Sequence, residues 1–297
     1  MTPPTVTVLM AVRNGSRYLR TAMESILRQS WSDFRFLIVD DQSTDDTREI
    51  ARSYADRRIE LLCLERNVGQ TAALNIGLRK ASSPWIARMD ADDFSAPSRL
   101  EEQMRALGAE PDLACVGTAI WEFQDDPAVV EVVRRRPERH EEIRRAALHG
   151  AGMIHGSIVV QRRALLEVGA YDERYRYASD REMFIRFFSR YPARNLPEAL
   201  VGIRRHPAQD SFSRSAINEY VEIFRRLLQQ EGYGPDEREI LRSNLAYSYL
   251  LRATCEKRLG RYGSSLLDCG RALSASPGAC LRGALKATGR AVVRRPG

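Results

Sequence analysis

The sequence predicts an α/β protein with a doubly wound, mostly parallel sheet flanked by helices. Short segments rich in Val, Ile and Leu alternate with segments whose apolar residues have helical spacing, and polar residues follow three of the apolar segments directly. This alternation is typical of a parallel sheet covered on both faces, which binds ligands at the carboxyl ends of its strands. The expected strands are Thr5–Ala11, Phe34–Val39, Ile59–Leu64 and Trp85–Met89, and the expected helices are Tyr18–Gln29, Asp45–Tyr54 and Thr71–Ala81.

Less regular alternation continues to about residue 213. We expect the charged segment Asp125–Leu148 to be mobile, or helical over His140–Leu148. Ser43 or Thr44 is placed to cap the second helix, a role that Asp41 could share with Ser43. The remaining expected elements are helices Ser98–Leu107, Arg163–Val168 and Arg181–Arg190 and strands Leu113–Phe123, Ser157–Gln161 and Ala199–Arg204.

From about Ser215 the pattern is helical only, so we divide the chain into a domain over 1–213 and a helical, basic region over 214–297. Within this region, five residues have the spacing of part of a tetratricopeptide repeat. A single repeat cannot bury its own apolar face, so we expect a helical hairpin packed on the main domain rather than an array. The five residues are Gly260, Tyr262, Ser265, Ala272 and Pro277.

Composition excludes several classes of protein. The sequence contains no run of about 18 apolar residues, so no membrane span is predicted. The N-terminal apolar run lacks the flanking residues of a signal peptide, and we therefore expect a cytoplasmic chain. The five cysteines are scattered and form no CxxC pair, which favours small buried apolar side chains over a disulfide framework or a zinc site.

The positive charge is concentrated in the tail. The net charge is 46 − 39 = +7, and residues 251–297 contain ten Arg or Lys against two acids. Such a tail suits peripheral contact with an anionic membrane, as at the inner face of the plasma membrane, or equally a solvated helical face. No nucleic-acid-binding signature accompanies it, so we expect no nucleic-acid partner.

Asp90, Asp92 and Asp93 follow the fourth expected strand. Three carboxylates within four residues repel one another, and a bound cation would offset that repulsion. Oxygen ligands suit Mg²⁺ or Mn²⁺, which take one or two carboxylates together with substrate phosphates. The alternative is a solvated acidic loop.

Two other loops, Val12–Gly15 after the first strand and Asp40–Ser43 after the second, should open on the same edge of the sheet. Asp40 and Asp41 end the second strand, where a carboxylate can accept a hydrogen bond from a nucleobase or from ribose. The segment Arg66–Gln70 precedes a helix N-terminus, whose N–H groups favour phosphate. The alternatives are a helix cap and a plain glycine turn.

Asp180 is the best candidate for a general base, although an acid in the first turn of a helix is more often structural. His155 and His206 lie in loops that we expect to form pocket walls, and each histidine would more often be structural. The GxSxG, GxxxxGK[ST], HExxH and dinucleotide-binding glycine motifs are absent.

Seven stretches in order, spanning roughly Thr5 to Ser213, are similar to the family 2 inverting glycosyltransferases with the GT-A fold. They read VTVLMAVRNGSRYLRTAMESILRQSW, FLIVDDQSTDDT, RNVGQTAALNIGL, IARMDADD, HGSIVVQRRALLEVGAYDE, ASDREMFIRF and RRHPAQDS. The family's usual Glu before the catalytic Asp is Ser179, and the Gly of its usual VDDGS is Gln42. The QxxRW signature of processive synthases is absent, which favours transfer of a single sugar.

The resemblance implies roles for individual residues. Asp180 would be the catalytic base, Asp90 and Asp92 would form the DxD with Asp92 as the closest metal ligand, and Asp41 would face the nucleobase. Further contacts to acceptor or diphosphate would come from Asp93, His155 and His206. The donor would also contact Ala11, Arg13, Asp40, Asn67, Gly69 and Gln70.

The implied reaction is a metal-dependent, inverting transfer from a nucleotide-diphosphosugar to a saccharide or lipid-linked hydroxyl acceptor, as in cell-surface polysaccharide or glycolipid assembly. Two alternatives stay open at this stage. A nucleotidyltransferase uses a similar sheet, but the glycine- and lysine-rich loop typical of one is absent. A non-catalytic binding module would not need Asp41, Asp92 and Asp180.

Overall fold

The chain divides into two compact units, residues 1–209 and 210–297. The structure is a computed structural model that describes residues 5–206, 214–278 and 280. The boundary expected near Ser213 therefore lies outside the described residues.

One sheet organises the first unit. Its described strands follow the order β3-β2-β1-β4-β8-β6-β9-β5, and β7 pairs with β6. The first four of these are parallel neighbours, β6 and β9 are also parallel, and β5, β7 and β8 pair antiparallel, which confirms the predicted fold class. The strands are β1 (Val6–Val12), β2 (Phe34–Asp40), β3 (Ile59–Cys63), β4 (Trp85–Arg88), β5 (Phe94–Ser95), β6 (Cys115–Phe123), β7 (Val132–Arg134), β8 (Val159–Gln161) and β9 (Ala193–Arg204).

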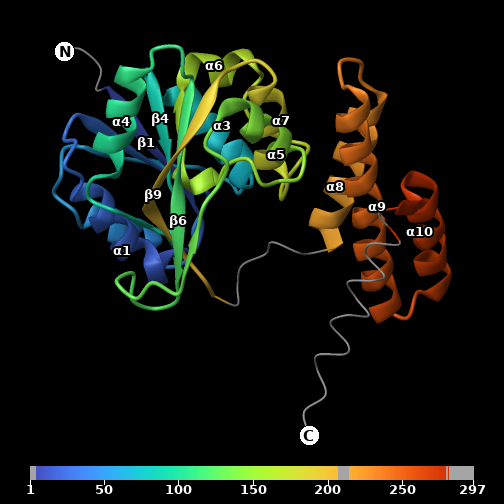
Figure 1. The fold of residues 1–297 in the computed structure, drawn as a ribbon. Coiled ribbons are helices and arrows are strands. Elements are labelled where there is room, and N and C mark those ends of the chain that lie inside the picture. The colour runs from blue at the N-terminus through green and yellow to red at the C-terminus, as the bar shows by residue number, and fades with distance from the viewer. Residues whose placement is uncertain (1–4, 207–213, 279, 281–297) are drawn as a thin grey trace, which may run out of the picture. The chain divides into compact units, whose positions relative to one another are not determined.

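Helices cover both faces of this sheet. Figure 1 shows α1 and α4 on one side of the sheet and α3, α5 and α7 on the other. Val8 and Met10 of β1 pack with Leu19 and Met23 of α1, whereas Leu9 faces α3. This alternation follows from the two-residue period of a strand. The helices are α1 (Ser16–Leu27), α2 (Thr47–Arg52), α3 (Gln70–Lys80), α4 (Arg99–Ala109), α5 (His140–Ala147), α6 (Arg162–Glu167) and α7 (Ser179–Phe188), with a short 3-10 helix, η1 (His155–Ser157).

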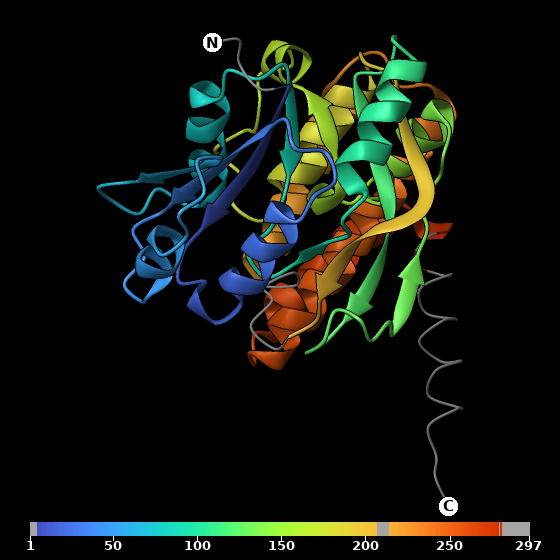
Figure 2. The same ribbon diagram turned by 90° about the vertical axis from the view of Figure 1, so that its left-hand side faces the viewer.

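The strand register brings the loops that follow β1, β2 and β4 to one edge. Val12 of β1 pairs with Asp40 of β2, and Leu9 of β1 pairs with Arg88 of β4. A Cβ added at Gly15 would lie 3.6 Å from Cβ of Ala91, so the loops after β1 and β4 also touch. In Figure 2, β1 to β3 in blue lie at one end of the sheet, and β6 and β9 in green and gold lie at the other.

Three strands differ from expectation. β5 has only two residues, and β7 is an exposed three-residue strand inside the segment expected to be mobile or helical. β9 begins six residues earlier than predicted, at Ala193. Its pairing with β6 is interrupted around Pro197, where the register shifts, and this irregularity hides the strand in the sequence.

The cysteines are free, as expected, but only Cys115 is fully buried. The expectation of five buried apolar side chains is therefore wrong for the other four, which are partly exposed.

The second unit contains α8 (Arg214–Gln229), α9 (Pro235–Arg258) and α10 (Tyr262–Ala275). α9 and α10 form a helical hairpin in which Ser265 Oγ donates to the Ala253 carbonyl over 2.9 Å and Ala272 is fully buried. None of the helices in the described ranges is both long and apolar enough to cross a membrane. Part of the basic tail, residues 279 and 281–297, lies outside these ranges.

Candidate active site

Asp90 follows β4 and is held by two side chains. Arg88 Nη2 lies 2.5 Å from Asp90 Oδ1, and Gln70 Nε2 donates to the same oxygen over 3.3 Å. Burial alone raises the pKa of Asp90, but the Arg88 charge and these hydrogen bonds outweigh it and lower the pKa below its ordinary value. Asp90 is therefore an anion at neutral pH, and it brings Gln70, at the start of α3, to the end of β4.

Asp92 is the more exposed carboxylate of the DxD, with 32% of its side chain accessible. His206 Nε2 lies 2.9 Å from Asp92 Oδ2, and Arg204 Nε donates to the Asp92 carbonyl over 3.0 Å. Both partners belong to the end of β9 and the residues after it. The Arg204 guanidinium lies 4.5 Å from the ring centroid of Tyr18, and the His206 ring lies 5.2 Å from the same ring. The structure thus joins Asp92 and His206, which are 114 residues apart in the chain.

Asp93 points inward and is only 3% exposed. Its Oδ1 accepts a hydrogen bond from the Arg204 backbone N–H over 3.1 Å. Burial, together with the charges of Asp90 and Asp92, raises the pKa of Asp93 well above its usual value. A carboxyl group in these surroundings has little surface for a ligand, so we assign Asp93 to the support of the site rather than to direct contact.

Gly156 of η1 was not among the predicted site residues, although it lies in the recognised stretch HGSIVVQ. A Cβ added there would lie 3.3 Å from Asp93 Oδ2 and 3.4 Å from Asp90 Oδ2. Two carboxylates that are not adjacent in the chain therefore converge on this glycine. A side chain at position 156 would press the Asp93 carboxylate outward by a few tenths of an ångström and would stand in close contact with that of Asp90.

The loops after β1 and β2 are tied to each other. The Asn14 N–H donates to Ser43 Oγ over 2.9 Å, and the Thr44 N–H donates to Asn14 Oδ1 over 2.8 Å. Ser43 and Thr44 therefore do not cap α2, contrary to expectation. The first helical N–H, that of Thr47, instead donates to Asp45 Oδ1 over 3.1 Å.

Asp41 binds the segment that precedes α3 rather than capping α2. Its two carboxylate oxygens accept hydrogen bonds from the N–H groups of Val68 and Gly69, over 2.7 and 2.8 Å. The neighbouring Gln42 takes a left-handed backbone conformation with φ of 58°, and its Oε1 accepts from the Asn67 N–H over 3.0 Å. The residue found in place of the family's usual glycine thus pays a conformational cost and adds a contact to the same segment.

Asp40 is buried, as is Asp41 (3% exposed), but the two carboxylates bind different partners. The Asp40 side chain is fully buried, its Oδ2 lies 2.5 Å from Arg48 Nε, and both of its oxygens lie within 3.3 Å of the Ser43 N–H. No carboxylate oxygen of Asp40 is exposed to a ligand, so we remove this residue from the expected donor contacts.

The other expected donor residues gather along the same edge. Ala11 is buried within β1, whereas Arg13 is exposed after it. With the Asn67 amide oriented so that its oxygen faces Arg13, that oxygen accepts from Arg13 Nε over 2.6 Å. Gly69 has φ of 86° and directly precedes α3, a conformation that favours glycine.

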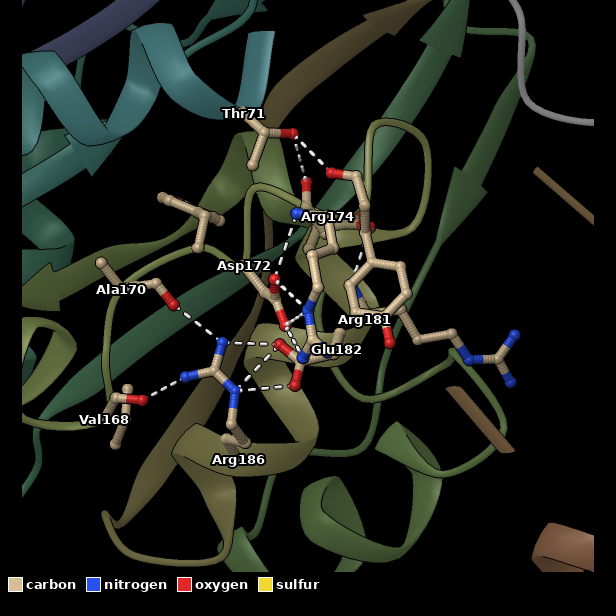
Figure 3. Close-up of polar contacts among 12 residues, drawn as sticks. Thr71, Val168, Ala170, Asp172, Arg174, Arg181, Glu182 and Arg186 are labelled. Carbon is tan, nitrogen blue, oxygen red and sulfur yellow. Dashed lines mark hydrogen bonds and ion pairs between the residues drawn. The ribbon is translucent and has the colours of Figure 1, made fainter. Parts of the chain in front are cut away.

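Helix α3 is also bonded to the segment that leads into α7. Thr71 Oγ1 lies 2.8 Å from the Tyr175 carbonyl and 3.1 Å from Ser179 Oγ. Asn75 Nδ2 donates to the Tyr171 carbonyl over 2.8 Å. Figure 3 shows Thr71 above this segment. Because Gln70 contacts Asp90, a single helix connects the acidic site to the start of α7.

A buried ion pair fixes the same segment from its other side. Arg186 Nε lies 2.8 Å from both Glu182 oxygens, and its Nη2 donates to the Ala170 carbonyl over 2.8 Å. Its Nη1 donates to the Val168 carbonyl (Figure 3). The Glu182 side chain is 2% exposed, whereas that of Arg186 is 29% exposed, so the carboxylate is shielded from water and the guanidinium is partly accessible. In the sequence, Glu182 and Arg186 are recognisable only as opposite charges four residues apart on a helix, and the burial of Glu182 cannot be inferred from that spacing.

Asp180 lies in the first turn of α7, one residue after the helix begins. Burial raises the pKa of Asp180 above the ordinary aspartate value, and the charge of Asp90 acts in the same direction. The Arg181 N–H donates to Asp180 Oδ1 over 2.7 Å. Asp180 therefore lies within electrostatic reach of the DxD and favours its protonated form more than a solvated aspartate does.

His155 lies beside this site but does not carry a charge at neutral pH. Burial, reinforced by the charge of Arg88, lowers the pKa of His155 to about 3. Its Nε2 lies 2.7 Å from the Tyr171 hydroxyl, and its ring meets that of Phe184 edge to face. A neutral, packed imidazole fits a pocket wall better than a cationic partner for diphosphate.

The acidic group offers oxygen ligands to a divalent cation but not a complete cage. Over the described ranges, no group of three or more His, Cys, Asp or Glu side chains is arranged to hold a metal ion by itself. Mg²⁺ and Mn²⁺ suit such a partial site, because they commonly bind one or two carboxylates and complete their shell with phosphate and water oxygens. The ionised Asp90 and the accessible Asp92 fit that requirement.

Comparison with known proteins gives the class of this site. The family model described as Glycosyl transferase family 2 matches residues 7–169. The putative glycosyltransferase EpsE of Bacillus subtilis is 34% identical over 220 residues, which cover 72% of this chain and 77% of EpsE. The amylovoran biosynthesis glycosyltransferase AmsE of Erwinia amylovora is 28% identical over 63% of this chain and 70% of AmsE.

Solved structures agree on the fold. The S. aureus TarS 1-349 structure in complex with UDP-GlcNAc matches with a TM-score of 0.72 at 15% identity, covering 91% of this chain and 81% of that one. The mannosyltransferase PcManGT from Pyrobaculum calidifontis, in complex with GDP-Man and Mn²⁺, matches with a TM-score of 0.64 at 20% identity over 99% and 82% of the two chains.

The chain belongs to glycosyl transferase family 2. Its relatives are named glycosyltransferases, and its sheet has the GT-A arrangement of the solved structures. The sequence left three hypotheses open: a glycosyltransferase, a nucleotidyltransferase and a non-catalytic binding module. The comparisons confirm the first of these.

Proposed function

We propose that this chain is a metal-dependent, inverting glycosyltransferase that moves one sugar from a nucleotide-diphosphosugar to a hydroxyl of a saccharide or lipid-linked acceptor. The observation that carries the proposal is the meeting of three segments around one acidic group. Asp90 and Asp92 follow β4, and His206 follows β9 and contacts Asp92. Asp180 lies in the first turn of α7, and the charge of Asp90 contributes to its raised pKa.

The donor would lie along the edge formed by the loops after β1, β2 and β3. Asp41 already orders the backbone before α3, and Arg13 and Asn67 lie together on that edge. The N-terminus of α3 at Gln70 offers N–H groups toward phosphate. One solved structure is a complex with UDP-GlcNAc and another a complex with GDP-Man, which supports a nucleotide-diphosphosugar as the donor class without favouring one base.

A divalent cation would be held by Asp92 and Asp90 together with the donor diphosphate, where its charge offsets that of the leaving nucleoside diphosphate. Gln70 and Arg88 hold Asp90 in place, and His206 orients Asp92. Mn²⁺ in the PcManGT structure supports a divalent ion in this fold.

Asp180 would act as the base. It would accept the proton of the acceptor hydroxyl as that oxygen forms a bond to the anomeric carbon and the carbon–oxygen bond to the diphosphate breaks. Attack on the face opposite the leaving group inverts the configuration. A raised pKa improves the proton affinity of the base, and such catalysis typically contributes ~10²–10⁴-fold.

Cell-surface polysaccharide or glycolipid assembly is the process we propose, since AmsE is named for the biosynthesis of such a polymer. The test is release of nucleoside diphosphate from a panel of nucleotide-sugars with Mn²⁺ and saccharide acceptors. Asp92→Asn should abolish release, and Asp112→Asn, the same charge change at an exposed position, should not. Equal release by both variants would remove the DxD from the proposed mechanism.

A further inference from the structure

The turn between α9 and α10 has exposed cations and exposed apolar side chains side by side. Lys257 and Arg258 end α9, and both are exposed. Leu259 is 57% exposed and Tyr262 is 68% exposed. Surface leucines are ordinary singly, but a contiguous group with a cationic border marks an interaction site.

The apolar group continues along α10. Leu266 is 75% exposed and Leu273 is 53% exposed. At about 100° per residue, Tyr262, Leu266 and Leu273 fall within roughly 40° of one another around the helix axis. The opposite side of the helix, with Asp268 and Ala272, is buried. We call Leu259, Tyr262, Leu266 and Leu273, with Lys257 and Arg258, the hairpin surface.

The exposed charges of the hairpin surface itself are positive, because the two acids within residues 251–297 are buried. Residues 251–297 contain two acids, Glu256 and Asp268, and each is 3% exposed. Each is also neutralised: Glu256 pairs with Arg214 and Arg261, and Asp268 pairs with Arg252 and Arg271.

Lys257 and Arg258, in contrast, form no ion pair with any residue of the described ranges. The acids at the start of α9, from Asp236 to Glu239, lie roughly 30 Å away along the helix. Residues 281–297 add five Arg or Lys and no acid to the same end of the sequence.

We propose that the hairpin surface docks on an anionic lipid membrane. A helix that lies in a membrane interface needs apolar side chains on one side and cations at the border of that side. The apolar side chains enter the boundary of the acyl chains, and the cations pair with lipid head groups. Tyr262 adds an aromatic ring with a polar tip, a residue type suited to that boundary. The proposal does not depend on the donor or on the catalytic residues.

The test is flotation of the full chain with vesicles of phosphatidylcholine alone, or with about 30 mol % phosphatidylglycerol. Binding should require the anionic lipid and should weaken as NaCl rises from about 0.1 M, where the Debye length is ~10 Å. At about 1 kcal/mol per cation near the surface, Lys257→Gln with Arg258→Gln should weaken binding roughly thirty-fold.

A matched pair, Arg225→Gln with Arg242→Gln, removes two exposed cations from α8 and α9 away from the turn and should leave most of the binding intact. Tyr262→Ser with Leu266→Ser should weaken binding roughly tenfold or more, since apolar burial is lost. The control for Tyr262→Ser with Leu266→Ser is Val129→Ser with Val133→Ser, which changes two exposed apolar residues of the first unit.

Equal binding to neutral vesicles, or equal losses in the test and control pairs, would overturn the proposal. Light scattering without lipid tests whether a second copy of the chain covers the hairpin surface instead of a membrane. A dimer that becomes monomeric in the variant Tyr262→Ser with Leu266→Ser would also overturn the proposal. Nucleoside diphosphate release without vesicles should be unchanged in every hairpin variant, so failure here is separate from failure of the proposed function.

Discussion

Replacing Arg186 with methionine tests whether the buried ion pair holds the segment before Asp180. The Arg186 guanidinium contacts both oxygens of Glu182, at 2.6–2.8 Å, and the carbonyls of Val168 and Ala170. Methionine keeps most of the side-chain volume but leaves the Glu182 carboxylate, 2% exposed, without this cation. Removing one partner of a fully buried pair typically costs about 3–5 kcal/mol. Because the Arg186 side chain is itself 29% exposed, we expect a loss toward the lower end of that range.

Urea unfolding followed by tryptophan fluorescence measures this loss in the first unit alone. The three tryptophans of the chain, Trp31, Trp85 and Trp121, all belong to that unit. Arg174→Met is the matched control, because Arg174 pairs with Asp172 two residues away and is 62% exposed. An exposed pair of this kind contributes about 0–1 kcal/mol.

The double variant Arg186→Met with Glu182→Met distinguishes a lost charge balance from lost packing. It removes both charges, so it should be more stable than Arg186→Met alone. An Arg186→Met loss no larger than that of Arg174→Met would refute the reasoning, as would a double variant less stable than the single one.

Three further predictions concern single residues of the first unit: Glu122 of β6, Thr71 of α3 and Gly156 of η1. Hydrogen bonds from Arg205 and Arg134 lower the pKa of Glu122 from 4.5 to about 2, so its contribution to stability is present above pH 4.5 and is lost as the pH falls toward 2; thermal unfolding against pH should show this loss, and Glu122→Gln should not. Thr71→Val should cost about 0.5–1.5 kcal/mol in urea unfolding because the hydrogen bond from Thr71 Oγ1 to the Tyr175 carbonyl is lost, whereas Thr71→Ser keeps the hydroxyl and should recover most of it. Gly156→Ala crowds the Asp90 and Asp93 carboxylates and should weaken Mn²⁺-dependent nucleotide binding by about 1–3 kcal/mol, and Gly108→Ala, with nothing within 4 Å of its Cβ, should not; calorimetry of nucleoside diphosphate with Mn²⁺ compares them.

Much of the fold could be predicted because its signals are local. The first four strands consist mainly of apolar residues, and each begins and ends within one or two residues of the prediction. The polar residues after β1, β2 and β4 converge because parallel strands end at one edge. β5 and β7 were missed because two or three residues give no periodicity.

The site was less predictable where a role depends on burial or on pairing at long range. Adjacent aspartates in the sequence separate in the structure: Asp40 is enclosed with Arg48, and Asp41 orders the segment before α3. The contact of His206 with Asp92 joins β9 to β4, and no local pattern specifies that distance. Gly156 has a function only through the carboxylates that approach it.

The proposed division of roles between Asp92 and Asp180 is tested most directly by measuring binding and transfer on the same variants. The binding readout is the thermal shift produced by nucleoside diphosphate with Mn²⁺, and the transfer readout is turnover of the best donor. Asp180→Asn should keep the wild-type thermal shift and lose transfer by ~10²–10⁴-fold, whereas Asp92→Asn should lose both. Transfer at the wild-type rate by Asp180→Asn, or an undiminished Mn²⁺-dependent shift in Asp92→Asn, would contradict the account.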